Sequence, residues 1–84
     1  MQRVISVRPL GKYRLEVRFD DGISGEVSLD NRLFGPVFEP LRDESLFGQV
    51  FVDEFGAVCW PNGADLAPDA MYDAIRVHGV WTPP

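Results

Sequence analysis

The most constraining feature of the sequence is an alternation of apolar and polar side chains on both sides of a short loop. Every second side chain is apolar in residues 13–19, and a matching pattern returns in residues 23–29. A period of two residues is typical of strands with one buried face. Opposed residues in a hairpin share a face, so Phe19 must oppose Ile23 or Gly25. A three-residue loop that ends in Gly22, at the left-handed position after a type I turn, pairs Phe19 with Ile23. This register sets three further pairs opposite one another: Leu15 and Val27, Glu16 and Glu26, and Lys12 and Asp30.

A second hairpin follows from the same argument. Val52 must oppose Val58 if the apolar side chains of both strands are to share a face, which leaves the loop Glu54-Phe55-Gly56. Residues 4–8 form a further strand, which Pro9 ends because proline cannot donate to a sheet ladder. We therefore predict about five strands, of which the first three form a meander.

Turns and short helices fill the remaining chain. Gly35 and two prolines exclude a long helix from residues 30–41, whose large apolar side chains are expected to point into the core: Leu33, Phe34, Phe38 and Leu41. Asp43 is a good N-cap for a short helix. A last helix is expected to begin at Pro68, where the missing amide hydrogen costs nothing, and to end before Gly79.

These elements define an α+β fold of about five mostly antiparallel strands. Their order is strand-strand-strand-helix-strand-strand-helix, with the two short helices packed on the sheet. With 84 residues, the chain is expected to form one domain, residues 1–84, with residues 76–84 as a tail.

Charge is distributed unevenly along the chain. Residues 1–18 hold five basic residues and one acidic residue, whereas residues 19–84 hold three basic and twelve acidic residues, which together give the net charge of −5. An acidic chain is poorly suited to binding phosphate backbones broadly, so nucleic acid is an unlikely partner. We expect the basic residues to pair with acids across neighbouring strands. The alternative is that the basic hairpin contacts nucleic acid through Arg8, Lys12, Arg14 and Arg18.

The residues that support catalysis or metal binding are few. Cys59 and His78 are the only cysteine and the only histidine, which leaves no histidine-rich or paired-cysteine metal site. Cys59 lies in a predicted strand and is expected to be a small buried apolar side chain. We expect no enzyme activity, no catalytic residue and no cofactor. A single cysteine fits the reducing cytoplasm, and no apolar run is long enough to cross a membrane.

The densest local signal is the string from Trp60 to Leu66. Pro61 ends a strand, Asn62-Gly63 supplies a turn, and Asp65 is placed to cap the turn that enters the last helix. One interpretation is a folded corner in which Trp60 fills the core. The other is a recognition surface formed by Trp60, Asn62 and Asp65, because aromatic anchors beside polar groups are typical of interfaces.

Three strings of the sequence resemble domain-of-unknown-function family 2442: Phe38-Glu39-Pro40-Leu41-Arg42-Asp43, Leu46-Phe47-Gly48-Gln49-Val50 and Trp60-Pro61-Asn62-Gly63-Ala64-Asp65-Leu66-Ala67-Pro68-Asp69. The resemblance spans about residues 3–75. It implies a small bacterial α+β protein without an assigned enzyme activity, in a family that carries a toxin–antitoxin label. Ala67 departs from the family, where serine is common at this helix cap. The resemblance brings no catalytic residues.

We therefore expect a non-enzymatic protein-interaction module, as the acidic, antitoxin-like member of a two-protein system with a basic protein partner. The alternative is a nucleic-acid-associated transcriptional regulator that uses the basic hairpin. A homodimer is a further expectation, because residues 4–8 carry apolar side chains on both faces and Phe51 and Cys59 point away from Val58 and Trp60.

Overall fold

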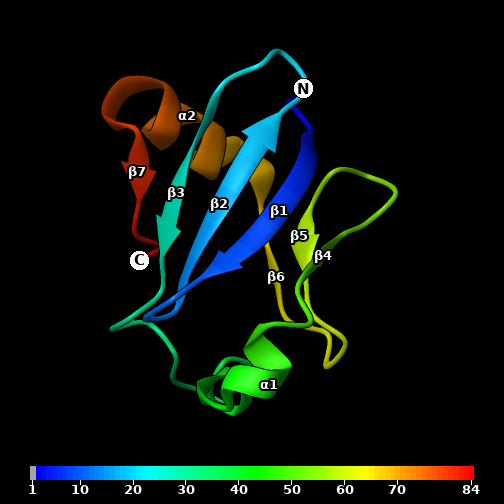
Figure 1. Cartoon of the computed structure of the whole chain (residues 1–84), viewed down its shortest axis with the longest axis vertical. Coiled ribbons are helices and arrows are strands. Elements are labelled where there is room, and N and C mark those ends of the chain that lie inside the picture. Colours follow the sequence, from blue (N-terminus) through cyan, green and yellow to red (C-terminus); the bar gives the residue numbers. More distant parts are fainter. Residues whose placement is uncertain (1) are drawn as a thin grey trace.

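The computed structural model describes residues 2–84 and contains two small sheets (Figure 1). The four-stranded sheet has the order β1 (Val4–Leu10), β2 (Arg14–Phe19), β3 (Ser24–Ser28) and β7 (Val80–Trp81). The three-stranded sheet has the order β4 (Phe51–Val52), β5 (Val58–Cys59) and β6 (Asp65–Leu66). Among the described strands, β3 and β7 pair in parallel and all other pairs are antiparallel. The helices are η1 (Glu39–Arg42, 3₁₀), α1 (Glu44–Phe47) and α2 (Pro68–His78).

The α+β class is confirmed, with more strands than expected and two sheets in place of one. The additional strands are β6 and β7, each of two residues. In Figure 1, α2 and β7 lie on the β3 side of the larger sheet, while β4 and β5 lie beside β1. Both helix predictions hold, because the Asp43 side chain caps α1 and α2 runs from Pro68 to the residue before Gly79.

The β2–β3 register is the one that the alternation predicts. Leu15 lies opposite Val27, and the Phe19 amide donates to the carbonyl of Ile23 over 2.7 Å. Gly22 closes this loop with φ of +92°, a conformation that glycine adopts without a steric penalty.

The same register does not continue to Lys12 and Asp30. The paired strand residues end at Arg14 and Ser28, because Lys12 and Tyr13 adopt left-handed φ angles of 62° and 59° and turn the chain toward β1. Asp30 therefore lies beyond the ladder.

The three-residue turn recurs twice in the smaller sheet. The β4–β5 hairpin has the predicted Val52–Val58 pair, and Gly56 has φ of +82°. A further hairpin joins β5 to β6, in which the Trp60 amide donates to Ala64 and Gly63 has φ of +95°. The string from Trp60 to Leu66 is thus a hairpin that the sequence analysis described only as a corner.

Strand β1 differs from the prediction in two ways. It continues through Pro9 to Leu10, which is possible because β1 is an edge strand whose outer amides need no partner. A bulge between Val4 and Ser6 also shifts its register. Val4 and Val7 both pack against the core as a result, and Ile5 is exposed. The apparent two-faced hydrophobicity of this strand therefore comes from the bulge, and it no longer supports a homodimer.

Residues 76–84 are part of the fold and are not a free tail. Residues 76–78 finish α2, residues 80–81 form β7, and the Pro83 carbonyl accepts a 2.7 Å hydrogen bond from Arg32 Nε. The core connects both sheets and all three helices through fifteen buried apolar residues among residues 2–84: Val4, Leu15, Val17, Phe19, Val27, Leu29, Leu33, Leu41, Phe47, Val58, Trp60, Ala64, Leu66, Met71 and Ile75. Phe34 was expected inside, but its exposed fraction is 59%.

Candidate functional site

The three residues of the predicted recognition surface have different environments. Trp60 is 2% exposed, and its Nε1 donates a 2.9 Å hydrogen bond to the Phe47 carbonyl inside the core. Asn62 is exposed, and its amide donates to the Val37 carbonyl over 2.8 Å. Asp65 is exposed in β6 opposite Cys59. Asp65 does not cap α2, because the N-cap position is Ala67. The structure does not bring these three side chains to one surface.

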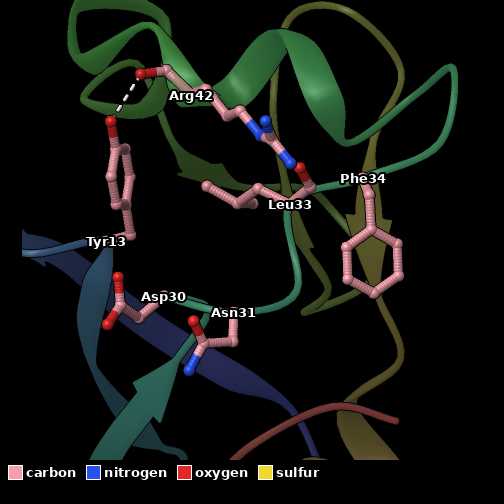
Figure 2. A pocket seen from close by; sticks show the side chains of 6 residues that line it. All are labelled: Tyr13, Asp30, Asn31, Leu33, Phe34 and Arg42. Carbon is pink, nitrogen blue, oxygen red and sulfur yellow. Dashed lines mark hydrogen bonds between the residues drawn. The ribbon is translucent and has the colours of Figure 1, made fainter.

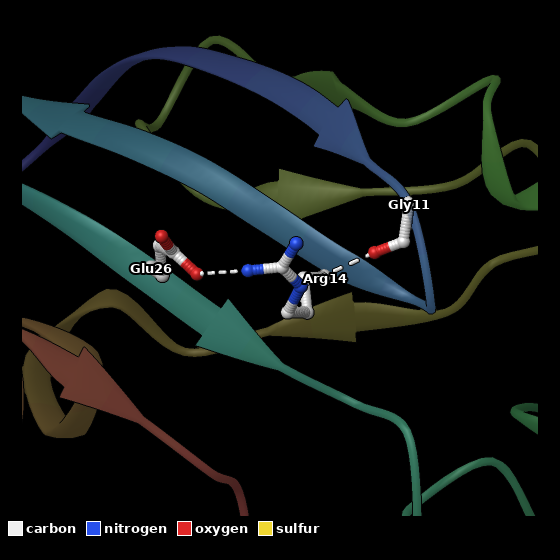
Figure 3. Close-up of polar contacts among 3 residues, drawn as sticks. All are labelled: Gly11, Arg14 and Glu26. Atoms are coloured by element: carbon white, nitrogen blue, oxygen red, sulfur yellow. Dashed lines mark hydrogen bonds and ion pairs between the residues drawn. The ribbon is translucent and has the colours of Figure 1, made fainter.

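Two of the basic residues proposed for nucleic-acid contact already have acidic partners. Arg8 pairs with Glu16 over 2.8 Å, and Arg14 pairs with Glu26 over the same distance. Figure 3 shows that Arg14 Nε also donates to the Gly11 carbonyl, which holds the guanidinium against the sheet. Arg18 is exposed in β2, and Lys12 is exposed in the β1–β2 turn. Cross-strand pairing thus neutralises half of this basic group.

The environment of Cys59 disfavours a reactive thiolate. Burial, together with the Asp53 carboxylate 3.5 Å away, raises the pKa of the thiol to about 11. His78 lies in the last turn of α2. Within residues 2–84, no three His, Cys, Asp or Glu side chains gather closely enough to hold a metal ion. No helix in the same residues combines the length and apolarity needed to cross a membrane.

The most distinctive surface is the segment of residues 30–42, which we call the Phe34 loop. Three side-chain hydrogen bonds fix it: Arg32 Nε donates to Pro83, Arg42 Nε donates to Leu33 within the loop, and Asn62 Nδ2 donates to Val37. Their lengths are 2.7, 2.7 and 2.8 Å. The loop nevertheless exposes 59% of Phe34 and 43% of Val37. A loop fixed at several points that exposes an aromatic ring is a preorganised surface.

A hollow lies on each side of Phe34. The polar hollow has a volume of about 310 Å³ and is lined by Tyr13, Asp30, Asn31, Leu33, Phe34 and Arg42 (Figure 2). The apolar hollow has a volume of about 130 Å³ and is lined by Leu29, Arg32, Phe34, Phe38, Leu66, Pro83 and Pro84. Phe34 therefore forms the ridge between two depressions.

The wall of the polar hollow contains a strained residue. Tyr13 has φ of 59°, which is unfavourable for a bulky side chain. Three contacts hold it in place. Its hydroxyl donates to the Arg42 carbonyl over 2.5 Å, its own carbonyl accepts from the Leu29 amide, and its ring meets Phe47 edge-on. The side chain of Tyr13 thus has a fixed position beside the hollow.

Sequence reasoning missed this surface. Phe34 was assigned to the core as a large apolar residue, although it directly precedes Gly35-Pro36. That turn signal is the one feature that points to an exposed position at a loop tip. The position of Tyr13 gives no such signal, because a left-handed turn usually contains glycine, asparagine or aspartate.

One comparison with known proteins gives a match. A family model described as "Protein of unknown function (DUF2442)" matches residues 4–77. No curated protein and no solved structure matches the chain.

Proposed function

The chain belongs to the family of unknown function DUF2442, and we propose that it is a non-enzymatic protein-interaction module that binds its partner through the Phe34 loop. The observation that carries this proposal is the exposed Phe34 ring on a loop held by three hydrogen bonds. Aromatic side chains beside preformed depressions are frequent anchors of protein interfaces. Little of the loop has to be ordered on binding, so most of the contact energy remains available for affinity.

The partner that we propose is a basic protein, with this chain as the acidic, antitoxin-like member of the pair. The net charge of −5 supports this choice, because long-range attraction accelerates encounter with a positively charged protein. The apolar contact at Phe34 supplies affinity, and the overall charge supplies the rate of association.

The nucleic-acid alternative has less support. Arg8 and Arg14 hold the carboxylates of Glu16 and Glu26, so they would have to break these pairs to contact phosphates. Arg18 and Lys12 remain exposed, but two cations on an acidic protein are a small footprint for a phosphate backbone.

The proposal is tested by affinity capture from lysate of the native host, with and without nuclease. The bait proteins are the wild type, Phe34→Ser and the control Phe55→Ser, whose phenylalanine is 71% exposed at the tip of the β4–β5 turn. We expect the wild type and the control each to capture a basic protein in stoichiometric amount. Phe34→Ser should reduce its affinity at least about 30-fold, the size of an interface hot spot.

Two results would contradict the proposal. Equal capture by Phe34→Ser and wild type would place the interface elsewhere. Recovery of nucleic acid alone, lost after nuclease, would favour the basic hairpin. Light scattering on the purified protein distinguishes a separate partner from a second copy, because a homodimer doubles the mass.

A further inference from the structure

Beyond partner binding, we propose that the polar hollow beside Phe34 binds a small zwitterion of the amino-acid class. Its ammonium group would lie against Asp30, and its carboxylate would lie against Arg42. This site lies on the same Phe34 loop as the proposed protein interface, but it uses charged residues of the loop, whereas the protein contact uses the apolar Phe34 ring.

The geometry that carries the inference is the position of two opposite charges. Asp30 and Arg42 both line the hollow. Figure 2 shows the Asp30 carboxylate and the Arg42 guanidinium on different sides of it, with Leu33 between them and Phe34 beside them. Because the charges stand on separate walls, the hollow presents an acceptor for cations and a donor for anions at the same time.

Neither charge has an ion-pair partner among the residues that the structure describes. The ion pairs within residues 2–84 are Arg8–Glu16 and Arg14–Glu26. Arg42 uses Nε to hold the Leu33 carbonyl, and its Nη atoms make no hydrogen bond to any residue that the structure describes. The Asp30 carboxylate likewise has no hydrogen-bond donor in residues 2–84. Asp30 also lies beyond the β2–β3 ladder, so no opposed strand residue covers it.

This arrangement selects against ligands with a single charge. A cation that approaches Asp30 is repelled by Arg42, and an anion at Arg42 is repelled by Asp30. A zwitterion can place its ammonium group near Asp30 and its carboxylate near Arg42. It then gains both attractions, which offset the two repulsions. The amide of Asn31 and the ring of Tyr13 line the same hollow, and they supply a further polar group and an aromatic surface for an ammonium group.

The size of the hollow limits the ligand. A volume of about 310 Å³ is at the lower end of the range for small-molecule sites, about 300–1,000 Å³. The walls are also preorganised, because the Tyr13 hydroxyl and Arg42 Nε hold the backbones of residues 42 and 33. A free amino acid fits this description better than a nucleotide.

The test is an NMR titration of the isotope-labelled full chain with glycine, β-alanine and 4-aminobutyrate, which separate their charges by increasing lengths. Butylamine and butyrate serve as single-charge controls. We expect amide shifts confined to residues 13, 30–34 and 42. At least one zwitterion should bind about fivefold or more tightly than either control, as expected for one additional exposed ion pair. Equal binding of zwitterions and controls, shifts elsewhere, or no shifts at millimolar concentrations would overturn the proposal.

Two variants separate the charges. Asp30→Asn should weaken the zwitterion about fivefold and leave butyrate binding equal or stronger. Arg42→Gln should weaken zwitterion binding by a similar factor and leave butylamine binding equal or stronger. Retained butylamine binding shows that the site is intact even if the loop loosens. Asp69→Asn, in the first turn of α2, is the control and should bind as the wild type does. Loss of all ligands in both variants, or no change in either, would contradict the proposal. The titration contains no protein partner, so its outcome is independent of the proposed function.

Discussion

Gly25 of β3 lies so close to Ile75 of α2 that a Cβ atom on Gly25 would sit 2.6 Å from Ile75 Cγ2. The same atom would lie 2.5 Å from the Gly79 carbonyl oxygen. The absence of a side chain at Gly25 therefore allows α2 to pack directly on the larger sheet. A backbone atom is one of the obstacles, so rotation of a side chain cannot relieve the clash.

Substitution of Gly25 by alanine should destabilise the protein. The helix must move away from β3, and we expect a loss of about 1–3 kcal/mol in the free energy of unfolding. Urea denaturation measures it. Gly11→Ala is the matched control, because its Cβ would meet no atom within 4 Å, and it should be neutral or slightly stabilising. Equal stability of the two variants would contradict this account of the β3–α2 contact.

The buried Trp60 should be sensitive to loss of its indole nitrogen. Trp60→Phe removes the donor to the Phe47 carbonyl and leaves space in a closed core, with an expected loss of about 2–3 kcal/mol. Thermal or urea unfolding measures this loss. Phe55→Ala, at an exposed position, should change stability by less than about 0.5 kcal/mol. A neutral Trp60→Phe would mean that Trp60 has no structural role.

Acid sensitivity should depend on Tyr72. The Tyr72 hydroxyl, followed by the Ile23 amide, lowers the pKa of Asp21 below 3.8. A lowered pKa adds stability above pH 3.8, and that stability is lost as the pH falls through the folded-state value. Tyr72→Phe should raise the pKa of Asp21 and reduce the loss of stability on acidification.

Carbon-13 NMR titration of the Asp21 carboxyl measures this change. Tyr13→Phe is the control, because the Tyr13 hydroxyl donates to a backbone carbonyl and not to an acid. It should leave the pKa of Asp21 unchanged. An identical Asp21 titration in wild type and Tyr72→Phe would show that the hydrogen bond is absent in solution.

Cys59 should react slowly with alkylating reagents at neutral pH. Its pKa is raised to about 11, first by burial and then by Asp53, so the thiolate that reacts is scarce. Asp53→Asn removes the negative charge but keeps an oxygen that can accept from the Phe55 and Ala57 amides. This variant should lower the pKa of Cys59 and speed the reaction with iodoacetamide at pH 8. An unchanged rate would show that Asp53 does not raise the pKa of Cys59 and would leave burial and the charge of Asp65 as its causes.

The hairpin registers could be predicted because parity excludes half of the pairings and a three-residue turn that ends in glycine selects among the rest. Phe19 faces the core only if it opposes Ile23, and Val52 only if it opposes Val58. Strands β6 and β7 were not predicted, because Asp65-Leu66 was assigned to the entry of the last helix and Val80-Trp81 to a tail. The pairing of β7 with β3 joins residues that are distant in sequence, so no local sequence pattern predicts it.

The candidate site was missed for a related reason. The bulge in β1 inserts one residue and reverses parity after Val4, so Val7 faces the core with Val4, although alternation places it with the exposed Ile5. Phe34 is exposed on a loop that hydrogen bonds to Pro83 and from Asn62, both distant in sequence, hold in place. Hydrophobicity alone predicts that a phenylalanine is buried. Only the tertiary structure shows that other apolar side chains form the core and that Phe34 lies outside it.

The parallel pairing of β3 with β7 also has a consequence for how the protein forms during synthesis. Strands β1 to β3 are contiguous and can pair as soon as they leave the ribosome. The free edge of β3 stays open until residues 80–81 arrive, and the Arg32–Pro83 contact spans a separation of 51 residues. During that interval the nascent chain exposes an unpaired strand edge to neighbouring chains. Residues 80–81, which are translated well after β3, therefore protect the edge of the first sheet from aggregation.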